Sequence, residues 1–159
     1  MADTIKIRPG NNVDIVEIRL MMKKLFLKWD KIDPIDKIDH NWFNSKSSDS
    51  LIRNRINNLS SKYYVASEYD RLIGYIYGTI QMRPESLSKG IGVVEELYIQ
   101  PDYRKKNVGK KLTKQLIKWF KTRNVKWSIV LVHSKDKNAN SYWKRMKYRD
   151  YNRKYKLKI

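Results

Sequence analysis

The sequence contains no cysteine and only two histidines in 159 residues. The absence of cysteine excludes disulfide bonds, thiolate metal ligands and a cysteine nucleophile. His40 and His133 are too few for a histidine-rich metal site, so we expect no metal. No apolar run approaches the roughly 20 residues of a membrane-spanning helix, and the segment MADTIKIRPG lacks the apolar centre of a signal peptide. We therefore expect a cytoplasmic protein without a membrane partner.

Several common functional motifs are also missing. The sequence has no phosphate-binding loop of the GxxxxGK type, no GxSxG nucleophile motif and no paired histidines that would bind a metal. These absences argue against a P-loop nucleotidase, a serine hydrolase of the GxSxG class and a metallohydrolase.

Charge is abundant, but it is unevenly distributed. The formal net charge is +19. Residues 1–100 hold 15 Lys and Arg against 13 Asp and Glu, whereas residues 101–159 hold 20 against 3. Such asymmetry indicates a polyanionic partner for the second part of the chain, or else a solvated basic surface.

The hydrophobic pattern predicts a mixed α/β protein. The length fits one domain, which we take as residues 1–159. Apolar residues at helical spacing predict four helices, with Asn12 capping the first, Ser48 or Asp49 starting the second and Leu59 facing inward. Alternation predicts strands at residues 4–9, 62–67, 72–82, 91–100, 127–134 and 148–159. The resulting order, β-α-α-β-β-β-α-β-α-β, gives a mixed sheet with helices on its faces.

The segment QPDYRKKNVGKKL, residues 100–112, is typical of a strand end, a tight loop and a helix start. It carries five basic residues and a single glycine, Gly109. A helix N-terminus already bears partial positive charge and free N–H groups. The segment therefore predicts a binding site for an anion with several negative charges.

The longer segment VVEELYIQPDYRKKNVGKKL, residues 93–112, resembles the acetyl-coenzyme A loop of the GNAT superfamily of N-acetyltransferases. That family has Gln or Arg, two residues, Gly, one residue, then Gly or Ala; here the matching residues are Arg104, Asn107 and Gly109. The element order and the segment NANSYWKRMKY are also similar, so the resemblance covers nearly the whole chain. It implies a GNAT-like three-layer fold and transfer of an acetyl group from acetyl-CoA to a primary amine, by direct attack in a ternary complex.

The resemblance also implies the cofactor-binding residues. The backbone of Leu97, Tyr98 and Ile99 is expected to pair with the pantetheine amides. Asn107 replaces the usual glycine, and asparagine tolerates a left-handed backbone. Gly109 is either a close-approach glycine or a plain turn residue, and Asn138 is a further candidate. The loop expected to hold the pyrophosphate comprises Arg104, Lys105, Lys106, Asn107, Val108, Gly109 and Lys110.

Acetyl transfer to an amine requires a base, because most amines are protonated at neutral pH. Glu95 and Glu96 are adjacent on a predicted strand, so we expect their side chains on opposite faces, with only one in the site. By resemblance, Glu95 is at the position of the catalytic base in polyamine-type relatives. Glu96 is the alternative base, and a surface glutamate without a catalytic role is the remaining interpretation of Glu95.

The general acid of the family is a tyrosine four residues after an alanine. From Ala139 that position is Trp143, and Tyr142 lies one residue earlier. Tyr142 is therefore our candidate acid. Tyr98, or departure of the thiolate without an acid, are the other interpretations.

Four aspartates recur at every third residue between the first two helices: Asp30, Asp33, Asp36 and Asp39. Family members line their acceptor pocket in this region, so the resemblance assigns Asp30 and Asp33, together with Glu96, to a cationic acceptor. A polyamine, an aminoglycoside-like sugar or a peptide amine would fit. The alternative is a solvated loop with helix-capping aspartates.

Two other functions remain open from the sequence. Trp143 at the tyrosine position is compatible with a catalytically impaired acyl-CoA-binding module. Basic residues interleaved with tyrosines in residues 144–158 are compatible with a nucleic-acid-binding domain. Exposed edge strands are compatible with a homodimer.

Overall fold

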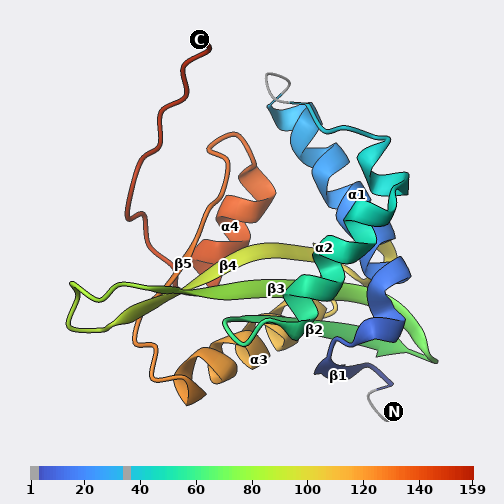
Figure 1. Ribbon diagram of the computed structural model, residues 1–159, viewed down its shortest axis with the longest axis horizontal. Helices are drawn as coiled ribbons and strands as arrows, with labels where there is room; N and C mark the ends of the chain where they lie inside the picture. Colours follow the sequence, from blue (N-terminus) through green and yellow to red (C-terminus); the bar gives the residue numbers. More distant parts are fainter. Residues whose placement is uncertain (1–3, 34–36) are drawn as a thin grey trace.

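A computed structural model describes residues 4–33 and 37–159 (Figure 1). One sheet holds the strands in the order β1-β2-β3-β4-β5. The pairs β1–β2, β2–β3 and β3–β4 are antiparallel, whereas β4 and β5 are parallel. The strands are β1 (Lys6–Pro9), β2 (Ser61–Glu68), β3 (Arg71–Met82), β4 (Gly90–Ile99) and β5 (Ser128–Val130).

Helices cover both faces of this sheet and make three layers. Figure 1 shows α1 (Ile15–Ile32) and α2 (Lys46–Asn57) on one side and α3 (Val108–Thr122) on the other. The last helix, α4 (Lys137–Arg145), shares a hydrophobic cluster with α3. Short 3-10 turns occur at Asn12–Asp14, Trp42–Asn44 and Pro101–Tyr103. The mixed α/β fold class is therefore confirmed.

The alternation of β3 explains the two cores. Tyr75 and Tyr77 point to the α1–α2 face, where they pack with Tyr63 and the buried side of α1. Ile76 belongs to the opposite cluster with Leu116 and other α3 residues. Gly78 shares that face: a Cβ there would lie 2.7 Å from Leu116 Cδ2, so the glycine lets α3 approach the sheet closely.

A β-bulge interrupts the pairing of β3 with β4. Tyr77 lies opposite Glu96 and Gly78 lies opposite Val94, so Glu95 has no partner residue. As a result both carboxylates reach the α1–α2 side: Glu95 accepts a hydrogen bond from Thr79 and Glu96 accepts one from Tyr75. The expectation that the two side chains point to opposite faces is wrong, because the extra residue breaks the alternation.

The strands β4 and β5 diverge after a short contact. Their pairing ends at Val94 opposite Val130, and β5 is much shorter than the strand expected at residues 127–134. Within the described residues no strand pairs with the β5 side of β4 from Glu95 to Ile99. This unpaired edge includes Leu97, Tyr98 and Ile99, the residues whose backbone the resemblance expects to pair with the pantetheine amides.

The terminal strand predicted at residues 148–159 does not form. Its supposed inward residues are exposed, with Tyr155, Leu157 and Ile159 at 90%, 84% and 114% exposure. Lys156 Nζ lies 2.9 Å from Asp33 Oδ2, so the segment runs toward the end of α1 and not along β5. Alternation alone did not specify a pairing partner.

Three boundary predictions also need correction. Asn11, not Asn12, accepts the capping hydrogen bond from Val13 N, and α2 begins at Lys46 rather than at Ser48 or Asp49. Leu59 is 80% exposed because α2 ends before it. In the described parts of the chain, no helix has the length and apolarity to span a membrane.

Candidate functional site

The loop before α3 adopts a strained backbone at two positions. Asn107 has φ 62° and ψ 5°, the left-handed conformation predicted for it, and its side chain makes no capping hydrogen bond. Lys105 has φ 62° as well, which the sequence did not indicate. Left-handed backbone is uncommon at non-glycine residues. Where it does occur, it is found more often than elsewhere at ligand-binding sites.

The start of α3 presents free N–H groups. Its first intrahelical hydrogen bond runs from Lys111 N to Asn107 O over 3.0 Å. The N–H groups of Val108, Gly109 and Lys110 precede that bond and have no acceptor within the helix. Together with the exposed Lys105 and the helix dipole, they form an environment suited to a phosphate.

Side-chain hydrogen bonds hold this loop at the end of β4. Gln100 Nε2 donates to Leu72 O over 2.7 Å, and the Tyr103 hydroxyl donates to Glu68 Oε2 over 2.7 Å. Arg104 Nε donates to Ile99 O over 3.1 Å. Arg104 therefore braces the strand end, while the exposed Lys106 lies with its Nζ 5.1 Å from the Tyr103 ring centre.

The open edge of β4 leads directly into this loop. Leu97 and Ile99 turn their side chains into the α3 cluster, and Tyr98 turns toward α1 and α2. Burial raises the pKa of Tyr98, although Arg104 opposes the shift. Within the described residues, the backbone of residues 95–98 has no strand on its β5 side, which leaves room for an extended ligand whose anionic end reaches α3.

Glu95 is half-buried at the bulge. Its Oε1 accepts a hydrogen bond from Thr79 Oγ1 over 2.7 Å, and the carboxylate is close enough to Tyr77 to influence its pKa. Thr79 was not singled out from the sequence, because its role depends on the bulge. A partly exposed carboxylate in the middle of the sheet is able to accept a proton from a ligand.

Glu96 is far more enclosed, at 4% exposure. It accepts hydrogen bonds from the Tyr75 hydroxyl at 2.8 Å and from Arg55 Nη1 at 2.7 Å. Burial raises the pKa of Glu96, although Arg55 and Tyr75 act in the other direction. Because its oxygens already have partners, Glu96 serves the packing beneath the site better than it would serve an incoming amine.

Arg55 is a residue that the sequence reasoning missed. It donates to Glu96 and to the Tyr63 hydroxyl, at 3.2 Å for the second, and its guanidinium lies 4.4 Å from the Tyr77 ring centre. A signal was present, since Arg55 lies three residues after Ile52 on the inward face of α2. A lone cation among inward apolar positions indicates a buried acidic partner.

Tyr142 and Trp143 separate clearly in the structure. Trp143 is 7% exposed and packs edge-on against Tyr148, so it is a core residue. The Tyr142 hydroxyl lies 2.8 Å from Thr113 Oγ1, at the first turns of α3. A Cβ on Gly109 would lie 3.4 Å from that hydroxyl, an ordinary contact distance, so Tyr142 lies against the first turn of α3. Burial raises the pKa of Tyr142, which keeps its proton in place.

The described aspartates at the end of α1 and just after it already have partners within the protein. Asp30 Oδ1 accepts a hydrogen bond from Ile38 N over 3.0 Å, and Asp39 Oδ1 accepts one from Asn41 N over 2.8 Å. Asp33 Oδ2 is 3.8 Å from His133 Nε2 and also contacts Lys156. Asp36 lies outside the described residues. Asp30 and Asp39 thus match the loop-capping alternative.

The start of α4 is tied to α1. Asp136 caps α4 by accepting from Ala139 N over 3.0 Å, and Lys28 Nζ lies 2.6 Å from its second oxygen. Burial alone would raise the pKa of Asp136, but Lys28 and the Ala139 N–H outweigh it and the pKa is lowered. Asn138 is exposed, whereas Asn140 donates to the carbonyls of His133 and Asp136.

Comparison with known proteins adds a family match. The model of the "Acetyltransferase (GNAT) family" matches residues 29–148. No curated protein sequence matches the chain. A transcriptional regulator from Bacillus halodurans C-125 is 12% identical with a TM-score of 0.80, over 98% of this chain and 99% of that one.

Two enzymes of known structure are also similar. The aminoglycoside N-acetyltransferase AAC(6')-Iy, solved with CoA, is 13% identical with a TM-score of 0.77, over 98% of this chain and 94% of that one. A ribosomal-protein-alanine N-acetyltransferase from Brucella melitensis biovar Abortus 2308 is 12% identical with a TM-score of 0.71, over 98% and 99%. Because the sequence identities are so low, these comparisons show only that the structures share the fold of this chain.

Proposed function

Because the chain belongs to the acetyltransferase (GNAT) family, we propose that it transfers the acetyl group of acetyl-CoA to a primary amine, by direct attack in a ternary complex. One observation carries the proposal: no described strand pairs with residues 95–99 of β4 on their β5 side, and residues 100–107 connect this edge to the N-terminus of α3, where N–H groups favour an anion. The structures of AAC(6')-Iy with CoA and with a CoA-linked bisubstrate analogue support this choice of cofactor. We assign the activity to one domain, residues 1–159.

The residues present fit acetyl-CoA. The N–H groups of Val108, Gly109 and Lys110 would bind the pyrophosphate, with Lys105 and Lys106 adding positive potential. The backbone of Leu97, Tyr98 and Ile99 would pair with the pantetheine amides as an added strand. When bound, the cofactor would supply an activated acetyl thioester. Arg104 and Asn107 would shape the loop, and Asn138, which is exposed in the first turn of α4, remains a candidate for a contact with the cofactor.

Glu95 is the proposed base. Its carboxylate, oriented by Thr79, would accept the proton that the acceptor amine loses, directly or through water. Tyr142 is the proposed acid, because its hydroxyl stays protonated beside Gly109 and Thr113 and would donate to the departing sulfur. Trp143 is buried in the core and has no such role.

The proposed acceptor is a cationic amine, such as a polyamine, an aminoglycoside-like sugar or a peptide amine. Glu95 at the bulge and Asp33 at the end of α1 supply the negative charge, with Asp30 shaping the loop beside it. Glu96 contributes indirectly, through Arg55 and Tyr77.

A thiol-release assay tests the proposal. Acetyl-CoA should raise the melting temperature of the protein, and one class in a panel of polyamines, aminoglycosides, amino acids and basic peptides should release free CoA. Glu95→Gln should lower kcat about 10²–10⁴-fold, while Glu85→Gln, an exposed carboxylate in a loop, should not.

Tyr142→Phe in the same assay tests the acid, with the exposed Tyr155→Phe as its control. Full activity of Glu95→Gln and Tyr142→Phe would reject both assignments. Stabilisation by acetyl-CoA without turnover on any amine would identify an impaired acyl-CoA-binding module. No stabilisation at high cofactor concentration would contradict the proposal as a whole.

A further inference from the structure

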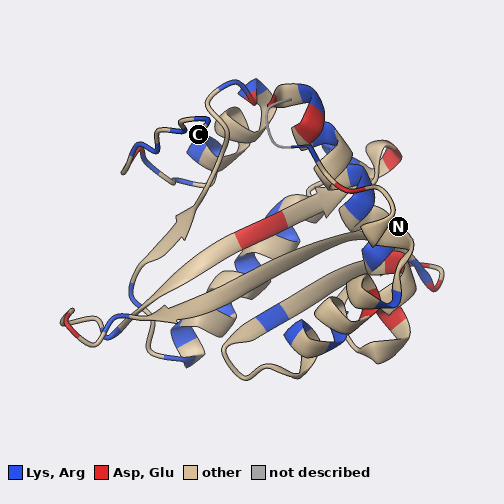
Figure 2. Cartoon of the chain, turned by 45° about the horizontal axis from the view of Figure 1, so that its top comes forward, with Lys and Arg blue, Asp and Glu red and all other residues tan. Residues whose placement is uncertain are grey.

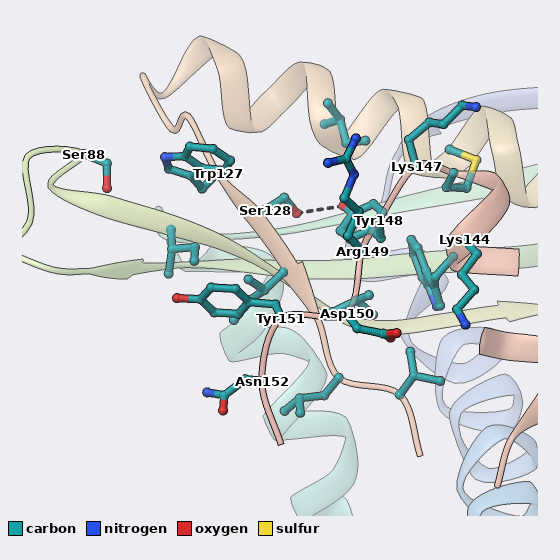
Figure 3. A pocket seen from close by; sticks show the side chains of 18 of the residues that line it. Ser88, Trp127, Ser128, Lys144, Lys147, Tyr148, Arg149, Asp150, Tyr151 and Asn152 are labelled. Atoms are coloured by element: carbon teal, nitrogen blue, oxygen red, sulfur yellow. Dashed lines mark hydrogen bonds between the residues drawn. The ribbon is translucent and has the colours of Figure 1, made fainter. Parts of the chain in front are cut away.

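A pocket of about 930 Å³ lies apart from the proposed transfer site. Its walls come from β5, the loop before β4 and the segment that follows α4 (Figure 3). None of residues 95–110 lines it. The proposed acetyl-CoA site therefore leaves this pocket unexplained.

Aromatic rings and cations surround this pocket. Trp127 and Tyr151 line it while remaining 70% and 75% exposed. Figure 3 also places Lys144, Lys147 and Arg149 around it. Asp150 is the one carboxylate among the lining residues. Tyr148 fixes one wall, since its hydroxyl lies 2.8 Å from Ser128 Oγ on β5.

A row of exposed lysines on α3 runs past the pocket. Lys114, Lys118 and Lys121 lie four and three residues apart and share one face of the helix; we call them the lysine stripe. Figure 2 colours the basic residues of α3 blue, behind the sheet. Ile117, which lines the pocket, lies three residues after Lys114 and four before Lys121. The stripe and the pocket are therefore continuous.

The stripe has no acidic residue near it in the sequence, because residues 103–135 include no Asp or Glu. Across residues 4–33 and 37–159, none of the three stripe lysines makes an ion pair. Beyond the stripe, Arg123 and Lys126 are exposed and lead to Trp127. A long run of positive charge without acidic partners attracts a polyanion.

We propose that the lysine stripe and the pocket bind single-stranded nucleic acid. Lysines four residues apart are about 6 Å apart along the helix axis, so successive side chains would contact successive phosphates. Trp127 and Tyr151 would stack on a base in the pocket, as aromatic rings do in single-strand-binding proteins. Exposed rings in a concave site favour bases over a lipid surface. None of these residues belongs to the proposed transfer site, so the two proposals stand or fall separately.

Fluorescence anisotropy tests the stripe, with a labelled oligouridine of about 20 nucleotides and the full chain in increasing KCl. The unmodified protein should bind, and its affinity should fall steeply with salt. The variant K114E/K118E/K121E should bind at least about tenfold more weakly, with a log–log salt slope shallower by about 2. Lys→Gln at the same positions should reduce the slope without reversing charge.

The control variant K24E/K46E/R53E makes the same charge change on the exposed surface of α1 and α2. It should keep most of the affinity and the salt slope. Circular dichroism and the acetyl-CoA thermal shift verify that each variant is folded. Equal losses in the two triple variants would overturn the proposal, because the binding would then follow net charge alone.

Trp127→Ala tests the pocket. It should weaken oligouridine binding about tenfold with an unchanged salt slope, and should not affect binding to a duplex of the same length. Unchanged affinity for the single strand would overturn the role of the pocket. Binding to vesicles that contain phosphatidylserine, without binding to the oligonucleotide, would overturn the proposal in favour of a lipid surface.

Discussion

Arg55 and Glu96 form a buried ion pair beneath the proposed base. Arg55 Nη1 lies 2.7 Å from Glu96 Oε1, with side-chain exposures of 23% and 4%. Removing a charge from water is costly, so such a pair adds little net stability, but loss of one partner leaves the other charged and unpaired. Tyr75 and Tyr77 complete the surroundings of this pair.

Arg55→Ala should therefore lower the free energy of unfolding by about 3 kcal/mol at neutral pH. Burial raises the pKa of Glu96 above its ordinary value of 4.5, and removal of Arg55 would raise it further. The deficit should be largest above the folded-state pKa and should shrink as the pH falls toward 4.5, because the neutral acid needs no cation. Urea unfolding across pH measures this.

The exposed Arg53→Ala, two residues earlier on α2, is the control and should change stability little. If Arg55→Ala lowers the free energy of unfolding by the same amount at every pH, the loss comes from packing and not from the unpaired charge of Glu96.

Among the elements, the turn into α3 has a strained, left-handed backbone. The cost of this conformation depends on the type of residue that adopts it. Left-handed backbone costs an ordinary L-residue about 1–2 kcal/mol, and costs asparagine less. Asn107 suits this position only through its tolerance of the left-handed backbone, because its side chain makes no capping hydrogen bond. Glycine would relieve the strain but would lose more entropy on folding.

Asn107→Ala should lower the free energy of unfolding by about 1 kcal/mol, and Asn107→Gly should leave it within about 0.5 kcal/mol. Thermal unfolding of both variants measures the difference. Asn54→Ala is the control, since Asn54 is exposed within α2 and alanine favours the helix there. Equal stability of the alanine and glycine variants would mean that the turn adopts another backbone conformation in solution.

Most elements were predictable from local pattern. The alternation in β2 and β3 and the helical spacing in α1 and α3 specify both faces of the sheet, and Asn107 was recognisable as a left-handed residue. The bulge at Glu95 was not predictable, because it depends on the register between two strands. Nor was the unpaired end of the chain, since alternation specifies a strand but not its neighbour.

The residues of the predicted site also separate into those that the sequence indicates and those that only the fold reveals. The loop before α3 and the open edge of β4 follow from a contiguous motif. The contacts of Glu96 with Arg55, and of Asp136 with Lys28, join residues far apart in the sequence. The spacing of Arg55 on α2 indicates a buried acidic partner but does not say which one, so Glu96 was assigned to the acceptor from the sequence, although Arg55 and Tyr75 bind it in the fold.

In the whole molecule, an ion pair and a neighbouring side-chain contact join α1 to the segment between β5 and α4, around the open edge of the sheet. Lys28 on α1 reaches Asp136 at the start of α4, and Asp33 lies beside His133 in the β5–α4 connection. Lys28 is 44% exposed, so solvent and salt weaken its pair with Asp136. These contacts link α1 to the connection between β5 and α4 across the open edge of β4.

Asp136→Asn keeps a side-chain oxygen that can cap α4 but removes the ion pair. It should lower the free energy of unfolding by about 0.5–1 kcal/mol at neutral pH and low salt. The pKa of Asp136 is lowered from 3.8 in the folded protein. The stabilisation should thus be complete above that value and should vanish as the pH falls through the folded-state pKa. Urea unfolding at several pH values measures this.

Lys28→Met in the Asp136→Asn background should add no further loss, which completes a double-mutant cycle. Additive losses from the two single changes would show that the residues do not interact in solution.

The bulge gives β4 one residue more than the sheet needs. In a regular stretch, deletion of one residue turns everything beyond it over to the other face. At Glu95 the deletion would leave Val94 facing Gly78 and Glu96 facing Tyr77, as they are now. Evolutionary variants of this chain could therefore lose or gain a residue at this position while the side chains of β4 keep facing the same two cores. The proposed catalytic carboxylate occupies a position that the architecture itself leaves optional.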